Sequence, residues 1–225
     1  MFYFVLVVIN KKISKGRPKN SGVVARALSK PEVRRLLATT RDSGKLTQEQ
    51  SQSGLRNEAL LLTGFHTCGR ISEICSLSVS DVLENGKVAS SVLFRKTKSK
   101  KARRVPLSDD LQKKLGSYLN LFQHRKEKKS LIECLDSPLF PSNKGGHFHP
   151  TSGSKLVKDL LASAGITNAG ASHIMRKTGL TMMHNAGCTL KALQCISGHS
   201  SISQLSTYLS ATTNQVDAAV NTIKF

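Results

Sequence analysis

The window between residues 172 and 208 constrains this chain most, because it carries in order several side chains that bind anions or move protons. His173 and Arg176 stand three positions apart, which places them on one face of a helix. Gly198-His199 and then Tyr208 follow. Each piece alone is weak, since a His/Arg pair is commonly a solvated helix face and a lone Tyr is commonly half-buried packing. Their order within one short window favours a single site.

Further cations stand upstream, at Arg70 and in a lysine-rich run before Val105-Pro106-Leu107. Arginine forks match the oxygens of a phosphate and stay charged near neutral pH. A tyrosine hydroxyl becomes a nucleophile when a base is near, and His and Lys move the protons that attack and departure require. No carboxylate cluster accompanies these groups. The set therefore predicts metal-free phosphoryl transfer through a phosphotyrosine.

These residues resemble the catalytic domain of a tyrosine recombinase, the phage-integrase family of site-specific DNA recombinases. Tyr208 follows His199 by nine positions, the family's usual step. The resemblance runs from Ala27 to the C-terminus. It implies the α+β, mainly helical fold of that catalytic domain, with a small antiparallel sheet at one edge. The matching pieces are Arg70-Ile71-Ser72-Glu73, Lys98 ahead of Arg104-Val105-Pro106-Leu107, His173-x-x-Arg176, Gly198-His199 and Tyr208.

The resemblance implies a role for each residue of the set. Tyr208 would attack the scissile phosphate and leave a 3′-phosphotyrosyl link and a free 5′-hydroxyl. Arg70 and Arg176 would hold the non-bridging oxygens. His173 would act as base or positioning donor, and His199 would hydrogen-bond a phosphate oxygen. We expect neither a metal ion nor ATP nor another cofactor, because the phosphotyrosine keeps the bond energy.

The leaving 5′ oxygen needs an acid, and the resemblance assigns this role to Lys98. Lys96, Lys100 and Lys101 are close rivals in the same loop. Glu73 stands one helical turn after Arg70, where it would orient that arginine or a nearby histidine. The family commonly reads Thr-Gly-x-Arg where this chain has Thr67-Cys68-Gly69-Arg70, a shift that we expect to be tolerated.

The charge balance predicts double-stranded DNA as the partner. The chain has 34 Lys and Arg against 14 Asp and Glu, a formal net charge of +20. Such a field favours a polyanion, although a solvated basic surface or an acidic membrane leaflet are the alternatives. The residues expected to contact DNA are Lys96, Lys100, Lys101, Arg103, Arg17 and Lys19.

Cysteine usage and hydropathy predict a cytoplasmic protein that does not enter a membrane. Five cysteines form no C-x-x-C pair and follow no secretory signal, so we expect reduced, mostly buried thiols. Cys188 and Cys195 lie seven apart, a spacing that favours packing on one helix face. The apolar stretch Met1–Ile9 is too short to span a bilayer. His147 and His149 lack further metal ligands and are interpreted as loop histidines.

Two parts are expected along the chain: residues 1–26, an apolar segment and basic linker, and residues 27–225, the catalytic domain. Within the linker, Lys15–Lys19 also faintly resembles an AT-hook, and a plain linker is favoured. Members of the resembled family usually carry an additional N-terminal helical domain that clasps the DNA. Only residues 1–26 precede the matching part here, so we expect competent cleavage with weak recombination by the chain alone.

Local signals place the main elements. Glu32 three after Ser29 makes a capping box, and an apolar run at 57–66 predicts a buried helix that Cys68-Gly69 ends. The other expected features are a loop at 42–53, strands at 88–94 and 103–107, an Asn-Gly turn at 84–87, helix starts at Ser108, Thr151 and Ser172, a helix at 189–196 ended by Gly198, a short helix bearing Tyr208, and a C-terminal helix over 214–225.

Three functions compete at this stage. Strand exchange by a site-specific recombinase or integrase is first. Nicking and religation as in type IB topoisomerases, and DNA binding by a catalytically idle regulator, are the alternatives. The C-terminal helix would either pack on its own domain or dock into a neighbouring protomer, as in the family's tetramers on DNA. Integration, excision and resolution are not distinguished by the residues.

Overall fold

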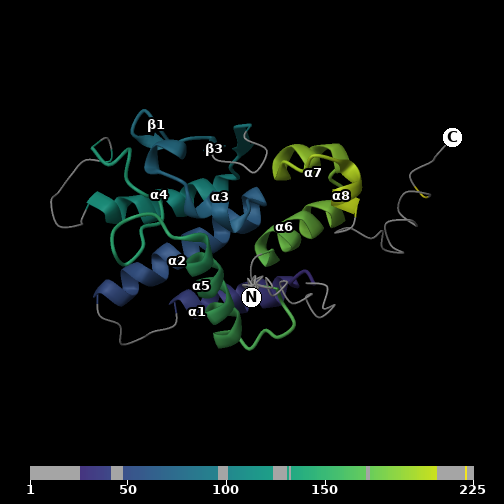
Figure 1. The fold of residues 1–225 in the computed structure, drawn as a ribbon, viewed down its shortest axis with the longest axis horizontal. Helices are drawn as coiled ribbons and strands as arrows, with labels where there is room; N and C mark the ends of the chain where they lie inside the picture. The colour runs from purple at the N-terminus through teal and green to yellow at the C-terminus, as the bar shows by residue number, and fades with distance from the viewer. Residues whose placement is uncertain are drawn as a thin grey trace, which may run out of the picture.

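The computed structural model describes residues 26–41, 48–95, 101–123, 131, 133–170, 173–206 and 221. The described part is mainly helical with two small antiparallel strand pairs, as expected for the α+β class (Figure 1). Its elements are α1 Lys30–Arg41, α2 Gln48–Thr67, α3 Ile71–Cys75, η1 Val79–Asp81, β1 Leu83–Glu84, β2 Lys87–Val88, β3 Ser91–Phe94, β4 Arg103–Pro106, α4 Asp109–Gln123, α5 Pro150–Ser163, α6 Ile174–Asn185, α7 Leu190–Ser197 and α8 Ile202–Ser206.

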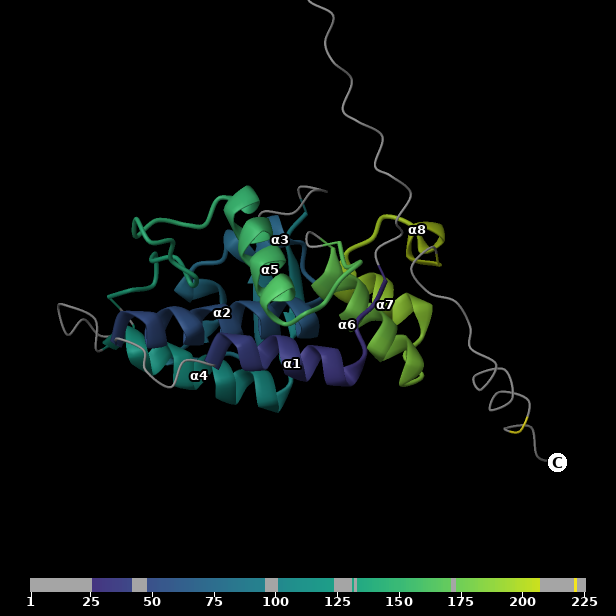
Figure 2. The same ribbon diagram turned by 90° about the horizontal axis from the view of Figure 1, so that it is seen from below.

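Helix α2 is the centre of the helical layer and packs against α1, α4 and α6 (Figures 1 and 2). Leu60 and Leu61 are fully buried, which confirms the core helix expected at 57–66. The loop expected at 42–53 is wrong for residues 48–53, which form the first turns of α2. Gln and Glu propagate a helix well, and a polar stretch without Gly or Pro gives no signal to stop one. Residues 42–47 lie outside the described part.

A sharp break separates α2 from α3, as the sequence predicts. Cys68 has a left-handed φ of 50°, and Arg70 is extended, with φ −70° and ψ 148°, at the N-cap of α3. Gly69 between them allows a close approach, because a Cβ there would lie 3.1 Å from both Ile74 and Phe94. The break therefore turns the chain so that Arg70 begins a new helix.

The strands form two hairpin-like pairs. Asn85 and Gly86 have φ of 51° and 74° between β1 and β2, which confirms the Asn-Gly turn. The strand expected at 88–94 is interrupted, since Val88 belongs to β2 and β3 begins at Ser91. Strands β3 and β4 are antiparallel, with Phe94 opposite Arg103 and Val92 opposite Val105. Residues 96–100 and their lysines lie outside the described part.

Most helix starts follow the local signals. The Ser29 backbone N–H donates to Glu32 Oε2 at 2.9 Å, and the N–H groups of Leu111 and Ala192 donate to the hydroxyls of Ser108 and Thr189. The prediction for Thr151 is wrong, because the ring of His149 caps α5 by accepting from the Thr151 N–H. Pro150 takes the first helical position, which moves the cap one residue before it. Ser172 lies outside the described part.

Helices α6, α7 and α8 gather at one end of the molecule (Figure 1) around Leu180, Leu193 and Leu205, all fully buried. Gly198, with φ 67°, ends α7 as predicted. The burial expected for Cys188 and Cys195 is wrong, because both are exposed. Cys188 lies before α7, and the apolar face of that helix carries Leu190, Leu193 and Ile196 instead of Cys195. Cys68 and Cys75 are buried and Cys134 is half-buried. Within the described ranges, no helix is long and apolar enough to cross a membrane.

The contact of α6 with α2 yields a stability prediction. A Cβ added at Gly179 would lie 2.1 Å from the Phe65 carbonyl oxygen and 2.8 Å from Cys68 Sγ. We expect Gly179→Ala to destabilise the fold by at least the roughly 1–3 kcal/mol typical of overpacking, because the obstacle is backbone. Gly116→Ala on α4 is the matched control, since its Cβ would meet only Val88 Cγ2 at 3.8 Å. Urea unfolding should show a lower midpoint for the first variant alone; equal midpoints would contradict the packing.

Candidate active site

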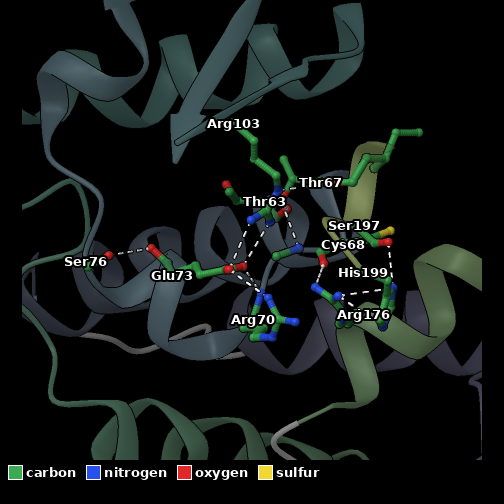
Figure 3. Close-up of polar contacts among 12 residues, drawn as sticks. Thr63, Thr67, Cys68, Arg70, Glu73, Ser76, Arg103, Arg176, Ser197 and His199 are labelled. Carbon is green, nitrogen blue, oxygen red and sulfur yellow. Dashed lines mark hydrogen bonds and ion pairs between the residues drawn. The ribbon is translucent and has the colours of Figure 1, made fainter. Parts of the chain in front are cut away.

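A buried carboxylate lies at the start of α3. Glu73 is 1% exposed, and its Oε2 accepts the Arg70 backbone N–H at 2.8 Å. Its Oε1 accepts Arg70 Nη1 at 3.0 Å. The expected contact between Glu73 and Arg70 is thus present, and it fixes the side chain of the arginine that begins the helix (Figure 3).

Arg103 on β4 binds the same carboxylate. Its Nη1 and Nη2 donate to Oε1 and Oε2 of Glu73 at 3.0 and 2.9 Å, a bidentate pair. The guanidinium carbon lies 4.4 Å from the centre of the Phe94 ring, and Nε donates to the Ile196 carbonyl at 3.2 Å. The DNA contact that the sequence predicts for Arg103 stays a prediction. The alternation of side chains along a strand is the sequence signal that could have indicated this inward position, because Arg103 and Val105 share the inward face of β4.

Arg176 on α6 is 2% exposed and bridges two distant segments. Its Nη1 donates to the Cys68 carbonyl at 2.9 Å, in the break between α2 and α3. Its Nη2 lies 3.1 Å from His199 Nε2 and 3.3 Å from Nδ1. Arg176, near the start of α6, and His199, in the turn that follows α7, are therefore brought into contact as the sequence window suggested (Figure 3).

The protonation of His199 follows from its neighbours. Ser197 Oγ donates to the Leu193 carbonyl at 2.6 Å and lies 2.7 Å from His199 Nδ1. A serine hydroxyl has one proton, so Nδ1–H is the donor in this pair, and Nε2 is the acceptor that faces Arg176. Burial, then the charges of Arg176, Arg70 and Arg103, lower the pKa of the His199 imidazole to about 4. The ring is neutral at physiological pH.

The cations at the site also affect one another and His173. Burial lowers the pKa of Arg176 to about 10, helped by the nearby charge of Arg70, so its guanidinium stays protonated near neutral pH. His173 occupies the N-cap of α6. Burial and the charges of Arg176 and Arg70 lower its pKa as well. Burial alone would raise the pKa of the Glu73 carboxyl, but hydrogen bonds from Arg103 and the Arg70 backbone outweigh it and lower that pKa.

Several predicted site residues lie outside the described part, so their positions are not part of this geometry: Tyr208, Lys98, Lys96, Lys100, Arg17 and Lys19. Lys101 is described and exposed just before β4. Across the described ranges, no group of three or more His, Cys, Asp or Glu side chains is placed to hold a metal ion. His147 contacts the Cys75 carbonyl at 3.1 Å, and His149 caps α5.

The arrangement suits an anion with several oxygens. Arg70 and Arg103 bind the Glu73 carboxylate, and the guanidinium of Arg176 is close enough to interact with it electrostatically. Three cations against one anion leave the site with a net positive charge in a partly buried place. Arginine donors held in fixed directions bind phosphate oxygens well, and low local polarity strengthens the attraction.

The sequence matches a known protein family. Residues 26–215 match the Phage integrase family. Over 194 residues the chain is 32% identical to the tyrosine recombinase XerD of Rhizobium meliloti (strain 1021), covering 85% of this chain and 58% of that protein. The chain thus spans less than two thirds of that relative's length.

Solved structures share the fold. A crystal structure of XerA recombinase gives a TM-score of 0.67 at 24% identity, covering 93% of this chain and 68% of that one. The XerH site-specific recombinase bound to its difH substrate, in a pre-cleavage complex, gives 0.64 at 22% identity, covering 88% and 53%. The family match spans most of the sequence and contains every described residue of the site. The chain belongs to the phage integrase family.

Proposed function

We propose that this chain cleaves and rejoins DNA strands as the catalytic part of a site-specific recombinase or integrase, through a 3′-phosphotyrosyl intermediate. The observation that carries the proposal is the convergence of Arg70, Arg176 and His199, from three separate elements, on one positively charged site. The family match over residues 26–215 supports a catalytic domain over 27–225. Double-stranded DNA is the proposed partner, in line with the net charge of +20.

The proposed reaction is an in-line displacement at phosphorus. The Tyr208 oxygen forms a bond to phosphorus, and the bond from phosphorus to the 5′ oxygen breaks. The tyrosine proton passes to a base, for which His173 is the proposed group, and Lys98 protonates the leaving oxygen. Rejoining reverses these steps with a 5′-hydroxyl as the nucleophile. The number of phosphoester bonds is conserved, so no external energy source is required.

Arg70 and Arg176 act on the charge that develops at the non-bridging oxygens. Their donors are held before the substrate arrives: Arg70 by Glu73, and Arg176 by the Cys68 carbonyl. Donors that need no reorganisation stabilise a transition state more than mobile ones do. In the free protein the His199 ring is neutral, and its Nε2 carries a lone pair. The negative charge of a bound phosphate favours protonation of Nε2, which can then donate a hydrogen bond to the phosphate.

The oligomer proposed for strand exchange is a tetramer on DNA, joined through the C-terminal helix expected at 214–225. That segment, apart from residue 221, lies outside the described part, so the tetramer stays a prediction. The cytoplasmic location expected from the sequence stays a prediction as well. Joining of two separate DNA sites distinguishes a recombinase from an enzyme that nicks and religates one duplex, as a type IB topoisomerase does.

The nucleophile is tested by covalent capture. After incubation with DNA of the source organism and denaturation, wild-type protein should retain covalently attached fragments that share a sequence. Tyr208→Phe should retain none, because it lacks the attacking oxygen. Tyr118→Phe is the matched control: Tyr118 is buried and its hydroxyl donates to the Leu139 carbonyl at 2.8 Å, so this variant should still form adducts. Adducts that persist in Tyr208→Phe would refute the assignment, and none from wild type would favour the idle regulator.

The role of Arg176 is tested on the DNA site found by capture. Arg176→Lys keeps a positive charge but loses the fork that reaches both the Cys68 carbonyl and His199. Removing a fixed transition-state donor typically slows a reaction by about 10²–10³-fold. We expect a loss of this size in the single-turnover cleavage rate, with DNA affinity changed far less. A cleavage rate within a factor of about three of the wild-type rate would contradict this role. A tenfold change in rate corresponds to about 1.4 kcal/mol in the activation free energy.

The titration of His199 is tested by NMR. The free protein should show an imidazole pKa near 4, below the ordinary 6.5, because of burial and the charges of Arg176, Arg70 and Arg103. Between pH 6.5 and about 4, His199 is protonated in the unfolded chain and neutral in the folded chain. The free energy of unfolding therefore decreases as the pH falls through this range. Added duplex DNA should raise the pKa. His199→Gln identifies the signal, and a free-protein value near 6.5 would refute the geometry.

A further inference from the structure

We propose that Arg103 is a positioning residue of the active site: it neutralises Glu73 so that the charge of Arg70 remains available for a phosphate, and it fixes the end of α7 that presents His199. The inference rests on the proposed function, and it gives Arg103 a task distinct from the DNA contact expected from the sequence.

The first step concerns the buried carboxylate. An ionised side chain that is 1% exposed needs compensation, because burial costs it several hydrogen bonds to water. Arg103 supplies two donors, one to each oxygen, at 3.0 and 2.9 Å. Among the contacts of the described residues, the guanidinium of Arg70 reaches Glu73 through Nη1 alone. Arg103 is therefore the main counter-ion of Glu73.

The second step is the charge that remains. With Arg103 in place, the guanidiniums of Arg70, Arg103 and Arg176 leave two net positive charges after Glu73 is subtracted. Without Arg103, the carboxylate would turn to Arg70 as its partner. Arg70 would then be held more tightly and would offer less charge to a phosphate.

The third step is mechanical. Arg103 lies between the Phe94 ring and the last turn of α7, where Nε donates to the Ile196 carbonyl. A Cβ on Gly198 would lie 3.2 Å from Arg103 Cδ, so the turn that follows the helix packs directly on this side chain. His199 is the next residue. One guanidinium thus sets the distance between α3, β4 and the turn that carries His199 (Figure 3).

The chain offers a matched control beside it. Arg104 carries the same charge, but strand alternation turns it to the opposite face of β4, where it is exposed and its Nη1 lies 3.5 Å from Ser91 Oγ. The side chain of Arg103 is only 12% exposed. Removing a positive charge from β4 would affect Arg103→Gln and Arg104→Gln alike. The loss of a positioning contact would affect Arg103→Gln alone.

The experiment compares Arg103→Gln, Arg103→Lys, Arg104→Gln and the double variant Glu73→Gln/Arg103→Gln on the captured DNA site. At saturating DNA, Arg103→Gln should slow single-turnover cleavage by about 10–100-fold, by analogy with the effect of removing a group that orients a metal ligand. Arg103→Lys should lie between it and wild type. The double variant should regain part of the rate, because it restores the net charge of the site. Arg104→Gln should cleave at the wild-type rate.

A wild-type cleavage rate in Arg103→Gln would overturn the proposal. A defect that saturating DNA removes would also overturn it, because Arg103 would then be a DNA contact. Melting temperatures, measured alongside, ensure that all rates are taken on folded protein. If Arg103→Gln does not fold, a full wild-type rate in Arg103→Lys overturns the proposal and a reduced rate supports it.

A second readout separates this inference from the proposed function. The NMR titration of His199 needs no cleavage, and its pKa responds to the charged groups that face the ring, which are Arg176, Arg70, Arg103 and Glu73. Arg103→Gln should raise that pKa, and Arg104→Gln should not. Wild-type protein that never cleaves DNA would refute the proposed function, while an unchanged His199 pKa in Arg103→Gln would refute the positioning role.

Discussion

The buried carboxylate of Glu73 is the interaction on which the site depends. A carboxylate removed from water must be met by donors and by positive charge, and the sequence supplies them from two elements: Arg70 at the start of α3 and Arg103 on β4. Breaking such a pair by removing one partner leaves an uncompensated charge, which typically costs about 3–5 kcal/mol. The carboxylate therefore joins the small sheet to the helical layer and, in the same contact, fixes the direction of an arginine.

The second requirement is that α6 and α7 meet this centre from the other side. Arg176 reaches across to the Cys68 carbonyl, and the Ile196 carbonyl accepts from Arg103, so each helix is attached by a guanidinium. The cost of burying these cations appears in the pKa of Arg176, which is lowered to about 10 yet leaves it charged. A site held together by shared cations is ready for an anionic substrate, because the substrate adds the negative charge that the free protein lacks.

Local residue type misleads where a neighbouring residue or distant packing decides the structure. The polar stretch at 48–53 predicts a loop because it has no apolar periodicity, but its residues begin a helix whose stability comes from packing further along. Thr151 carries the usual chemistry of a cap, yet Pro150 before it shifts the start to His149. Residue type also does not show how Arg103 is used: the alternation along β4 turns its side chain inward, and the DNA contact expected from the sequence stays a prediction.

Residue types alone predict most of the elements and the family, because caps, the Asn-Gly turn, the break at Cys68-Gly69 and the spacing of the motifs are short-range signals. The tertiary structure decided which side chains meet. Arg103 lies 30 positions from Glu73 and 93 from Ile196, and Arg176 lies 108 from Cys68. No local rule relates residues so far apart. Their contacts follow from how the core packs the helices and strands against one another, so only the folded chain reveals that one arginine organises the others.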